Sequence, residues 1–268
     1  ALSRDVAAKE LADEAKWTRY PHAEKAKKRV GISLGDLFDI KRGLATGDNK
    51  FFIMDRDQIE QRGLPIECFE PVLPSSRHLP TDIIEADENG LPLIEKQLFL
   101  LNTRLSADEI AQRYPLLEDY LSTGKKGDKA VAEGYLCRSR KPWYAQEKRP
   151  AAPIICTYMG RSRSGRKPFR FILNQSDATA CNVFLMLYPK PLLAEAAAQN
   201  PNIMRTVWEF LNEIDADELL SHGRVYGGGL HKLEPKELRG FPAEDLISRL
   251  PEIEPHQHQL GLLERATA

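Results

Sequence analysis

The chain has 268 residues, of which 42% are hydrophobic and 29% charged, and its net charge is −1. These values are typical of a globular protein with one large or two small domains, and they exclude intrinsic disorder. No apolar run approaches the length of a bilayer span and no signal peptide is visible, so we expect no membrane partner. The four cysteines are widely spaced without a CxxC pair, which argues against zinc and disulfides and favours the cytoplasm.

The first part of the chain predicts an arm followed by a core domain. Residues 1–29 contain good helix formers and then a basic run, and we expect a helical connecting arm there. The chain begins at Ala1 without an initiator Met, so we expect either a piece of a longer protein or a processed chain. Strand-like residues follow at 30–54, a short helix after Asp55, and an extended apolar segment at 91–101.

The middle and end of the chain alternate between helical and extended patterns. Ser106 and Glu109 form a capping box before a helix that Pro115 should interrupt and that should end by Gly124. Strands are predicted at 154–159, 169–173 and 183–188, and Asn200 and Pro201 indicate the start of an amphipathic helix. We therefore predict an α+β fold with a mixed or antiparallel sheet and peripheral helices, a core domain at 30–246 and a polar tail at 247–268.

Positive charge is concentrated in one window of the sequence. Residues 137–170 contain ten arginines and lysines but one acidic residue, Glu147. Aromatic side chains at Trp143, Tyr144 and Tyr158 interrupt this window. Arginines without acidic neighbours, interleaved with aromatic rings, favour binding to a polyanion over simple solvation.

A second cationic segment lies at 34–54. An apolar run leads into Lys41, Arg42 and Gly43, continues through small and polar residues, and returns to an apolar run at 51–54. The glycines allow a close approach of the backbone to another group, and the cations predict that this group is anionic. A hairpin turn of any α+β protein remains the alternative for this segment taken alone.

A complete catalytic set is not recognisable. The chain lacks both the glycine-rich loop that would admit S-adenosylmethionine and the Asn/Asp-Pro-Pro-aromatic turn of an amino-methyltransferase, and 227–229 match no phosphate loop. Glu234 and Lys236 have the spacing of a nuclease metal ligand and lysine, which leaves a metal-dependent nuclease as an alternative. We predict no catalytic and no metal-binding residue in this chain, and so a binding module.

Four segments in order resemble one family, the C-terminal target-recognition domain of TaqI-like N6-adenine DNA methyltransferases, including type IIG restriction-modification enzymes. The segments are LGDLFDIKRGLATGDNKFFI, RSRKPWYAQEKRPAAPIICTYMGR, FRFILNQSDATACNVFLMLYP and GRVYGGGLHKLEPKELRGFP. The resemblance implies that an absent upstream domain binds S-adenosylmethionine and accepts a flipped adenine, while this chain reads double-stranded DNA. It also implies that the chain binds no cofactor, has that upstream domain as a partner, and does not methylate DNA unaided.

The resemblance also implies two kinds of DNA-contacting residue. Contacts to phosphates are expected from Lys41, Arg42, Thr46, Asn49, Lys50, Arg161 and Lys232. Base-edge or stacking contacts are expected from Arg138, Arg140, Trp143, Tyr144, Arg163, Arg166 and Asn174. We expect the arginine-dense window and the Lys41 loop to form one positive surface.

Alternatives remain open for some of these residues and for the chain as a whole. Trp143 and Tyr144 fit a core equally well, and Asn174 fits a cap of the next segment. An RNA-binding module, whose aromatic side chains stack on single strands, is the third functional alternative.

Overall fold

The computed structural model describes residues 31–127, 129–161, 167–226 and 229–253. The chain divides into two compact units. Unit 1 contains Ala1–Arg42, Pro153–Leu173 and Leu185–Ala268, and unit 2 contains Gly43–Ala152 and Asn174–Phe184. The predicted arm at 1–29 lies outside the described residues, and the boundaries of the predicted core domain at 30–246 stay a prediction.

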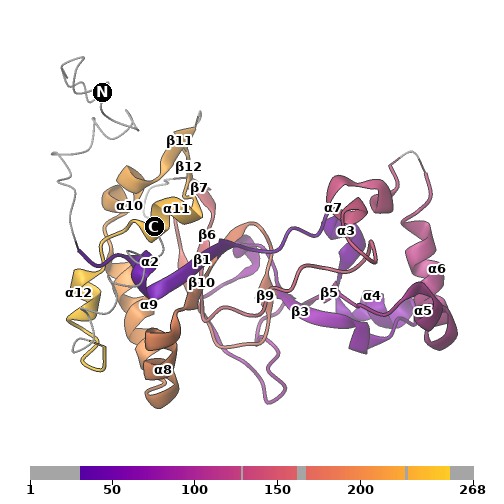
Figure 1. The fold of residues 1–268 in the computed structure, drawn as a ribbon, viewed down its shortest axis with the longest axis horizontal. Coiled ribbons are helices and arrows are strands. Elements are labelled where there is room, and N and C mark those ends of the chain that lie inside the picture. Colours follow the sequence, from indigo (N-terminus) through magenta and orange to yellow (C-terminus); the bar gives the residue numbers. More distant parts are fainter. Residues whose placement is uncertain (1–30, 128, 162–166, 227–228, 254–268) are drawn as a thin grey trace. The chain divides into compact units, whose positions relative to one another are not determined.

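The main sheet of unit 1 contains the three strands that the sequence predicted in its second half. Four of its strands lie in the order β1 (Phe38–Arg42), β10 (Phe184–Pro189), β6 (Ile154–Thr157) and β8 (Phe171–Asn174). Figure 1 labels β1, β10 and β6 of this sheet. β1 pairs antiparallel with β10, and β6 pairs antiparallel with β8. Every residue of β6 and β8 is buried, which explains their continuous apolar sequences.

A small antiparallel sheet in unit 1 has the order β11 (Arg224–Tyr226), β12 (Leu230–Lys232) and β7 (Met159–Arg161). The predicted strand at 154–159 is thus divided between β6 and β7. Gly160 lies in the middle of β7, where a Cβ atom would sit 1.6 Å from the carbonyl oxygen of Pro168. Only glycine fits this close approach.

Helices accompany both sheets of unit 1. α9 (Ile203–Glu213) buries Ile203, Val207, Phe210 and Leu211, which confirms the predicted apolar face. Its predicted start is wrong, because Asn200 ends the preceding helix α8 (Pro191–Gln199) and Asn202 is the N-cap of α9. The other helices are α2 (Leu34–Leu37), α10 (Ala216–His222), α11 (Pro235–Arg239) and α12 (Glu244–Ile247).

Unit 2 is built around a mixed sheet with the order β2 (Ile53–Met54), β5 (Leu98–Leu101), β3 (Phe69–Leu73) and β9 (Thr179–Ala180). β5 is antiparallel to both neighbours, and β9 is parallel to β3. The mixed and antiparallel sheets of the two units, with their surrounding helices, confirm the predicted fold class. A two-residue strand, β4 (Ile83–Ile84), also lies in this part of the chain.

The helices of unit 2 follow several of the predicted signals. α4 (Arg56–Gln61) begins after Asp55, and α5 (Ala107–Arg113) has the predicted Ser106–Glu109 capping box. Pro115 begins a new helix, α6 (Pro115–Thr123), and Gly124 ends it. The remaining elements are α3 (Asn49–Phe52), α7 (Tyr135–Arg138) and the 3-10 turns η2 (Ile66–Cys68), η3 (Ser76–His78) and η4 (Val131–Glu133).

The expectation of a continuous strand-like stretch at 30–54 is wrong in two places. α2 and α3 are single-turn helices, each followed directly by a strand. Ser33 and Asp36 form a capping box at α2, and Asp48 caps α3. These local side-chain bonds to the backbone favour a turn over the extended conformation that the apolar alternation suggests.

Two further findings concern the whole described chain. All four cysteines are buried and unpaired with one another. Among the described helices, none has the length and apolar character that crossing a bilayer requires.

Candidate nucleic-acid interface

In unit 1, two cationic side chains from the first and last of the four family-like segments lie over the ring of Tyr158. The guanidinium carbon of Arg42, at the end of β1, lies 4.4 Å from the ring centroid. The ammonium nitrogen of Lys232, at the end of β12, lies 5.0 Å from it. Tyr158 itself is buried, so cation–π contacts fix both cationic side chains against a rigid support.

Glu234 completes this group, which we call the Tyr158 cluster (Arg42, Tyr158, Lys232 and Glu234). Its carboxylate accepts the Tyr158 hydroxyl at 3.0 Å and pairs with the Lys232 ammonium at 2.6 Å. Burial alone would raise the pKa of Glu234, but the hydrogen bonds from Lys232 and Tyr158 outweigh it and the pKa lies below its ordinary value. The bonds to Glu234 and Tyr158 raise the pKa of Lys232 in turn, so the cluster holds a permanent lysine cation.

The contacts of Glu234 are also relevant to the alternative of a metal-dependent nuclease, in which Glu234 would be a metal ligand. Glu234 is the N-cap of α11, and its backbone N–H donates to the carboxylate of Glu237 at 2.9 Å. Among the described residues, no three histidine, cysteine or acidic side chains come together in a way that could hold a metal ion. The described contacts of Glu234 are therefore those of an internal ion pair and a helix cap.

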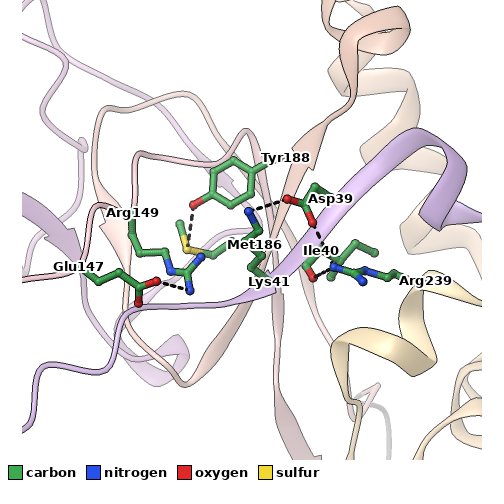
Figure 2. Close-up of polar contacts among 8 residues, drawn as sticks. All are labelled: Asp39, Ile40, Lys41, Glu147, Arg149, Met186, Tyr188 and Arg239. Carbon is green, nitrogen blue, oxygen red and sulfur yellow. Dashed lines mark hydrogen bonds and ion pairs between the residues drawn. The ribbon is translucent and has the colours of Figure 1, made fainter. Parts of the chain in front are cut away.

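A second pair of cations in unit 1 shares the carboxylate of Asp39 (Figure 2). The Lys41 ammonium lies 2.6 Å and the Arg239 guanidinium 3.0 Å from its oxygens. Arg239 also donates to the carbonyl oxygen of Ile40 at 3.0 Å, which ties α11 to β1. The Lys41 side chain is 47% exposed, and exposed ion pairs contribute little stability, so Lys41 can exchange Asp39 for another anion at small cost.

One face of the small sheet in unit 1 combines cations with exposed apolar groups. Arg161, Leu230 and Tyr226 lie opposite one another across the three strands, and the Lys232 ammonium lies 6.0 Å from the Tyr226 ring centroid. Met159 and Tyr226 are both more than 40% exposed. This face offers both charge and a flat aromatic surface to a ligand.

In unit 2, the loop that joins β1 to α3 is held at its beginning by contacts with the backbone of 180–182. A Cβ atom on Gly43 would lie 2.3 Å from the Cys181 carbonyl oxygen and 2.6 Å from that of Ala180. The close approach predicted for this glycine is therefore to the chain's own backbone. Leu44 continues the contact, since its N–H donates to Ala180 at 2.9 Å and its carbonyl accepts from Asn182 at 2.8 Å.

The far end of this loop is fixed by Asp48, and its middle by Arg140. The Asp48 carboxylate accepts the N–H groups of Lys50 at 2.8 Å and Phe51 at 3.2 Å and so caps α3. The Arg140 guanidinium donates to the carbonyl oxygens of Thr46 at 2.7 Å and Ala45 at 2.6 Å. Thr46 is buried, and its hydroxyl donates to the Asn49 side-chain oxygen at 2.6 Å. Two exposed side chains, those of Asn49 and Lys50, follow this fixed loop.

Aromatic side chains support the loop from within unit 2. Phe51 stacks on Tyr120 with ring centroids 4.7 Å apart, and Trp143 lies 5.7 Å from Phe51. The Tyr120 hydroxyl donates to the Phe51 carbonyl at 2.6 Å, and burial raises the pKa of Tyr120 to about 12. Tyr144 is buried and donates to Leu105 at 2.6 Å. The structure thus buries Tyr144 in the core of unit 2 and packs the partly buried Trp143 against that core, which is the alternative that the sequence left open.

Asn174 is also an interior residue of unit 2. Its amide nitrogen donates to the carbonyls of Ala178 at 3.0 Å and Ala152 at 3.3 Å. Its side-chain oxygen accepts from the Ser176 hydroxyl at 2.6 Å and the Ser176 N–H at 3.2 Å. These bonds close the turn after β8, as the capping alternative for this residue expected.

The cations of the basic window separate into those with internal partners and those on the surface. Arg149 pairs with Glu147 at 2.9 Å (Figure 2). Lys167 donates to the carbonyl oxygens of Asn212, in the last turn of α9, and of Ile214, the C-cap of that helix. Within the described part of the chain, the other exposed cations of the window are Arg138, Lys141, Lys148 and Arg161. Arg163 and Arg166 lie outside the described residues.

The predicted DNA-contacting residues therefore fall on both units. Lys41, Arg42, Arg161 and Lys232 belong to unit 1, whereas the other described ones belong to unit 2. The single positive surface stays a prediction. The contacts of Tyr158 with Arg42, Lys232 and Glu234, and that of Asp39 with Arg239, were not predicted, since these partners are distant from one another in the sequence.

Comparison with known proteins identifies the family of this chain. The family described as "Type II methyltransferase M.Eco57I, C-terminal domain" matches residues 17–263. The chain is 28% identical over 251 residues to the type II methyltransferase M.XamI of Xanthomonas campestris pv. amaranthicola, covering 93% of this chain and 42% of that protein. It is 24% identical over 244 residues to M.AccI of Acinetobacter calcoaceticus, covering 85% of this chain and 40% of that protein.

A solved structure is also similar at low identity. The type IIL restriction-modification enzyme MmeI, in complex with DNA, matches 69% of this chain and 24% of its own chain with a TM-score of 0.38 and 11% identity. The present chain spans about two-fifths of the length of the two methyltransferases. Because the family match includes nearly all of its residues, the chain belongs to the family of C-terminal domains of type II methyltransferase M.Eco57I, which confirms the resemblance found in its four segments.

Proposed function

We propose that this chain is the sequence-specific DNA-recognition region of an S-adenosylmethionine-dependent adenine-N6 DNA methyltransferase in a restriction-modification system. The observation that carries the proposal is the family membership over residues 17–263. The exposed cations of both units supply the matching chemistry, since a duplex presents a dense array of phosphates. The remaining part of the parent protein would bind S-adenosylmethionine and methylate the flipped base, so this chain alone would not be catalytic.

The surface geometry supports a division of labour between side chains. Lys41, Lys50 and Arg161 are exposed and suited to phosphates, and the Tyr158 cluster presents Arg42 and Lys232 from a rigid support. Arg138 is exposed on α7, and with Arg163 and Arg166 it is our proposed reader of base edges. The four buried thiols are compatible with the reducing cytoplasm, where we place the protein.

Binding titrations test the proposal directly. A preferred duplex is first selected from a randomised pool with the 268-residue chain, and its affinity is then compared with that of a scrambled duplex across salt concentrations. We expect Arg163→Ala or Arg166→Ala to lose about 1–3 kcal/mol of discrimination between the two duplexes. Lys41→Ala should weaken both equally and reduce the salt slope by about one. Equal losses on both duplexes for the arginine variants would count against base readout.

The same assay separates the other functions. Single-stranded RNA that displaces the selected duplex at lower concentration would favour an RNA-binding module. Metal-dependent cleavage of the duplex that Glu234→Ala abolishes would favour a nuclease. We expect neither result.

A further inference from the structure

The loop between β1 and α3 depends on one side chain for the shape of its middle part. Backbone bonds to Ala180 and Asn182 hold its beginning at Leu44, and the Asp48 carboxylate holds its end. Between these anchors, the carbonyl oxygens of Ala45 and Thr46 both accept from the Arg140 guanidinium. Within the described residues, the other polar contact to either carbonyl is the long one from the Cys137 thiol to Thr46, at 3.9 Å.

Arg140 is itself held in place by unit 2. Its Nη1 atom donates to the side-chain oxygen of Gln146 at 3.0 Å as well as to Thr46. Gln146 is buried and is fixed by Asn102, whose side-chain oxygen accepts the Gln146 N–H at 3.0 Å. Both terminal nitrogens of Arg140 are therefore directed into the protein. A guanidinium used in this way is a poor fork for a guanine edge, because its paired donors are already engaged.

We propose that Arg140 is a positioning residue that fixes the 45–48 loop and thereby presents Asn49 and Lys50 to DNA. The proposal rests on the DNA-recognition function proposed above, and it replaces the base contact that the sequence assigned to Arg140. Two hydrogen bonds connect Arg140 to Asn49 through Thr46. Arg140 fixes the backbone of Thr46, the Thr46 hydroxyl binds the Asn49 side chain, and Lys50 follows in the same helical turn. Fixing a binding loop before contact lowers the entropy that is lost when the ligand binds.

The test compares Arg140→Ala and Arg140→Lys with Arg138→Ala, an exposed arginine on the neighbouring α7. Amide hydrogen exchange of the DNA-free chain reports loop order, at the N–H groups of Lys50, Phe51 and Phe52, which all bond to Asp48. We expect exchange there to accelerate about tenfold or more in Arg140→Ala, less in Arg140→Lys, and not at all in Arg138→Ala. Low millimolar guanidinium chloride should partly restore protection in Arg140→Ala, whereas the same concentration of sodium chloride should not.

Duplex titrations across salt then distinguish positioning from direct contact. Arg140→Ala should weaken binding without changing the salt slope, whereas Arg138→Ala should change affinity without changing loop exchange. The proposal is overturned if Arg140→Ala leaves the exchange of 50–52 unchanged, or if guanidinium and sodium restore it equally. Should the wild-type chain fail to bind any duplex, the proposed function fails, while the exchange data still decide whether Arg140 fixes the loop.

Discussion

Several buried polar side chains in this protein, among them Asn174 and Tyr144, have partners that can be named atom by atom. Asn174 uses both its amide nitrogen and its oxygen within unit 2, and Tyr144 donates its hydroxyl to a backbone carbonyl. Removing one partner of a buried hydrogen bond lowers the stability by more than the bond itself contributed. The remaining polar group is then buried with neither a protein partner nor water. At these positions, a loss of DNA binding in a variant would follow from a loss of folding.

Asn174→Ala tests this distinction. We expect a loss of about 2–4 kcal/mol in the free energy of unfolding, because the carbonyls of Ala152 and Ala178 lose their donor and the turn loses its cap. Urea unfolding measures the change, with the exposed neighbour Gln175→Ala as a control that should stay within about 0.5 kcal/mol of wild type. A fully stable Asn174→Ala that has lost sequence preference would instead make Asn174 a base contact.

Asp39→Asn tests the role of the shared carboxylate near β1. Removing its charge releases Lys41 and Arg239 from an exposed pair, so duplex affinity should rise roughly three- to tenfold with a steeper salt dependence. The unfolding free energy should change by less than about 1 kcal/mol. Glu209→Gln on α9 makes the same change in net charge, and an equal rise in affinity for that variant would show that Asp39 has no local effect.

At the scale of elements, the Tyr158 cluster joins β1, β12 and α11 of unit 1. Because the folded-state pKa of Glu234 lies below the ordinary value of 4.5, ionised Glu234 favours the folded state. That contribution is fully present above the unfolded-state pKa, and it is lost as the pH falls through the lower, folded-state pKa.

Glu234→Gln should therefore have a pH-dependent effect on stability. Near neutral pH we expect the variant to be about 1–2 kcal/mol less stable than wild type, since Lys232 and the Tyr158 hydroxyl lose a charged acceptor. The difference should shrink as the pH is lowered below about 4.5, where the wild-type carboxylate also becomes neutral. Denaturant titrations at several pH values measure it, and a difference that stays constant down to about pH 3 would contradict the assigned ion pair.

Some helices and strands could be predicted from the sequence and others could not, for physical reasons. The strands β6, β8 and β10 were predictable from their apolar runs, and α5 from the Ser106–Glu109 capping box. The single-turn helices α2 and α3 were not, because four residues are too few to show helical periodicity. α8 was missed as well, since it begins after Lys190 without a side-chain cap.

Side-chain environment was harder to predict than element type. Lys41, Lys50 and Arg138 are exposed, as a DNA contact requires. Arg140 lies two residues after Arg138, but its guanidinium has a hydrogen-bond partner inside the protein. That partner is a backbone carbonyl 94 residues away in the sequence. The Tyr158 cluster likewise joins residues of three distant segments, and composition and spacing within a segment contain no information about such contacts.

At the scale of the whole molecule, both units present exposed cations, and DNA recognition by this chain would use both. A duplex neutralised by more lysines and arginines releases more counterions, so the salt slope counts the contacts that each unit makes. Because the net charge of the chain is −1, attraction to DNA would come from the local placement of the cationic residues and not from the net charge.

The most direct test of DNA recognition is therefore the salt dependence of duplex binding by two matched quadruple variants. One replaces Lys41, Lys50, Arg138 and Arg161 with alanine. The control replaces four exposed cations outside the candidate interface, two from each unit, namely Arg77, Lys96, Arg205 and Lys236. We predict that the first variant reduces the salt slope by about three, because three phosphate contacts are lost, and that the loss of Arg138 lowers the preference for the selected duplex by about 1–3 kcal/mol, while the control changes both little. Equal slopes and equal losses of affinity for the two variants would contradict the account.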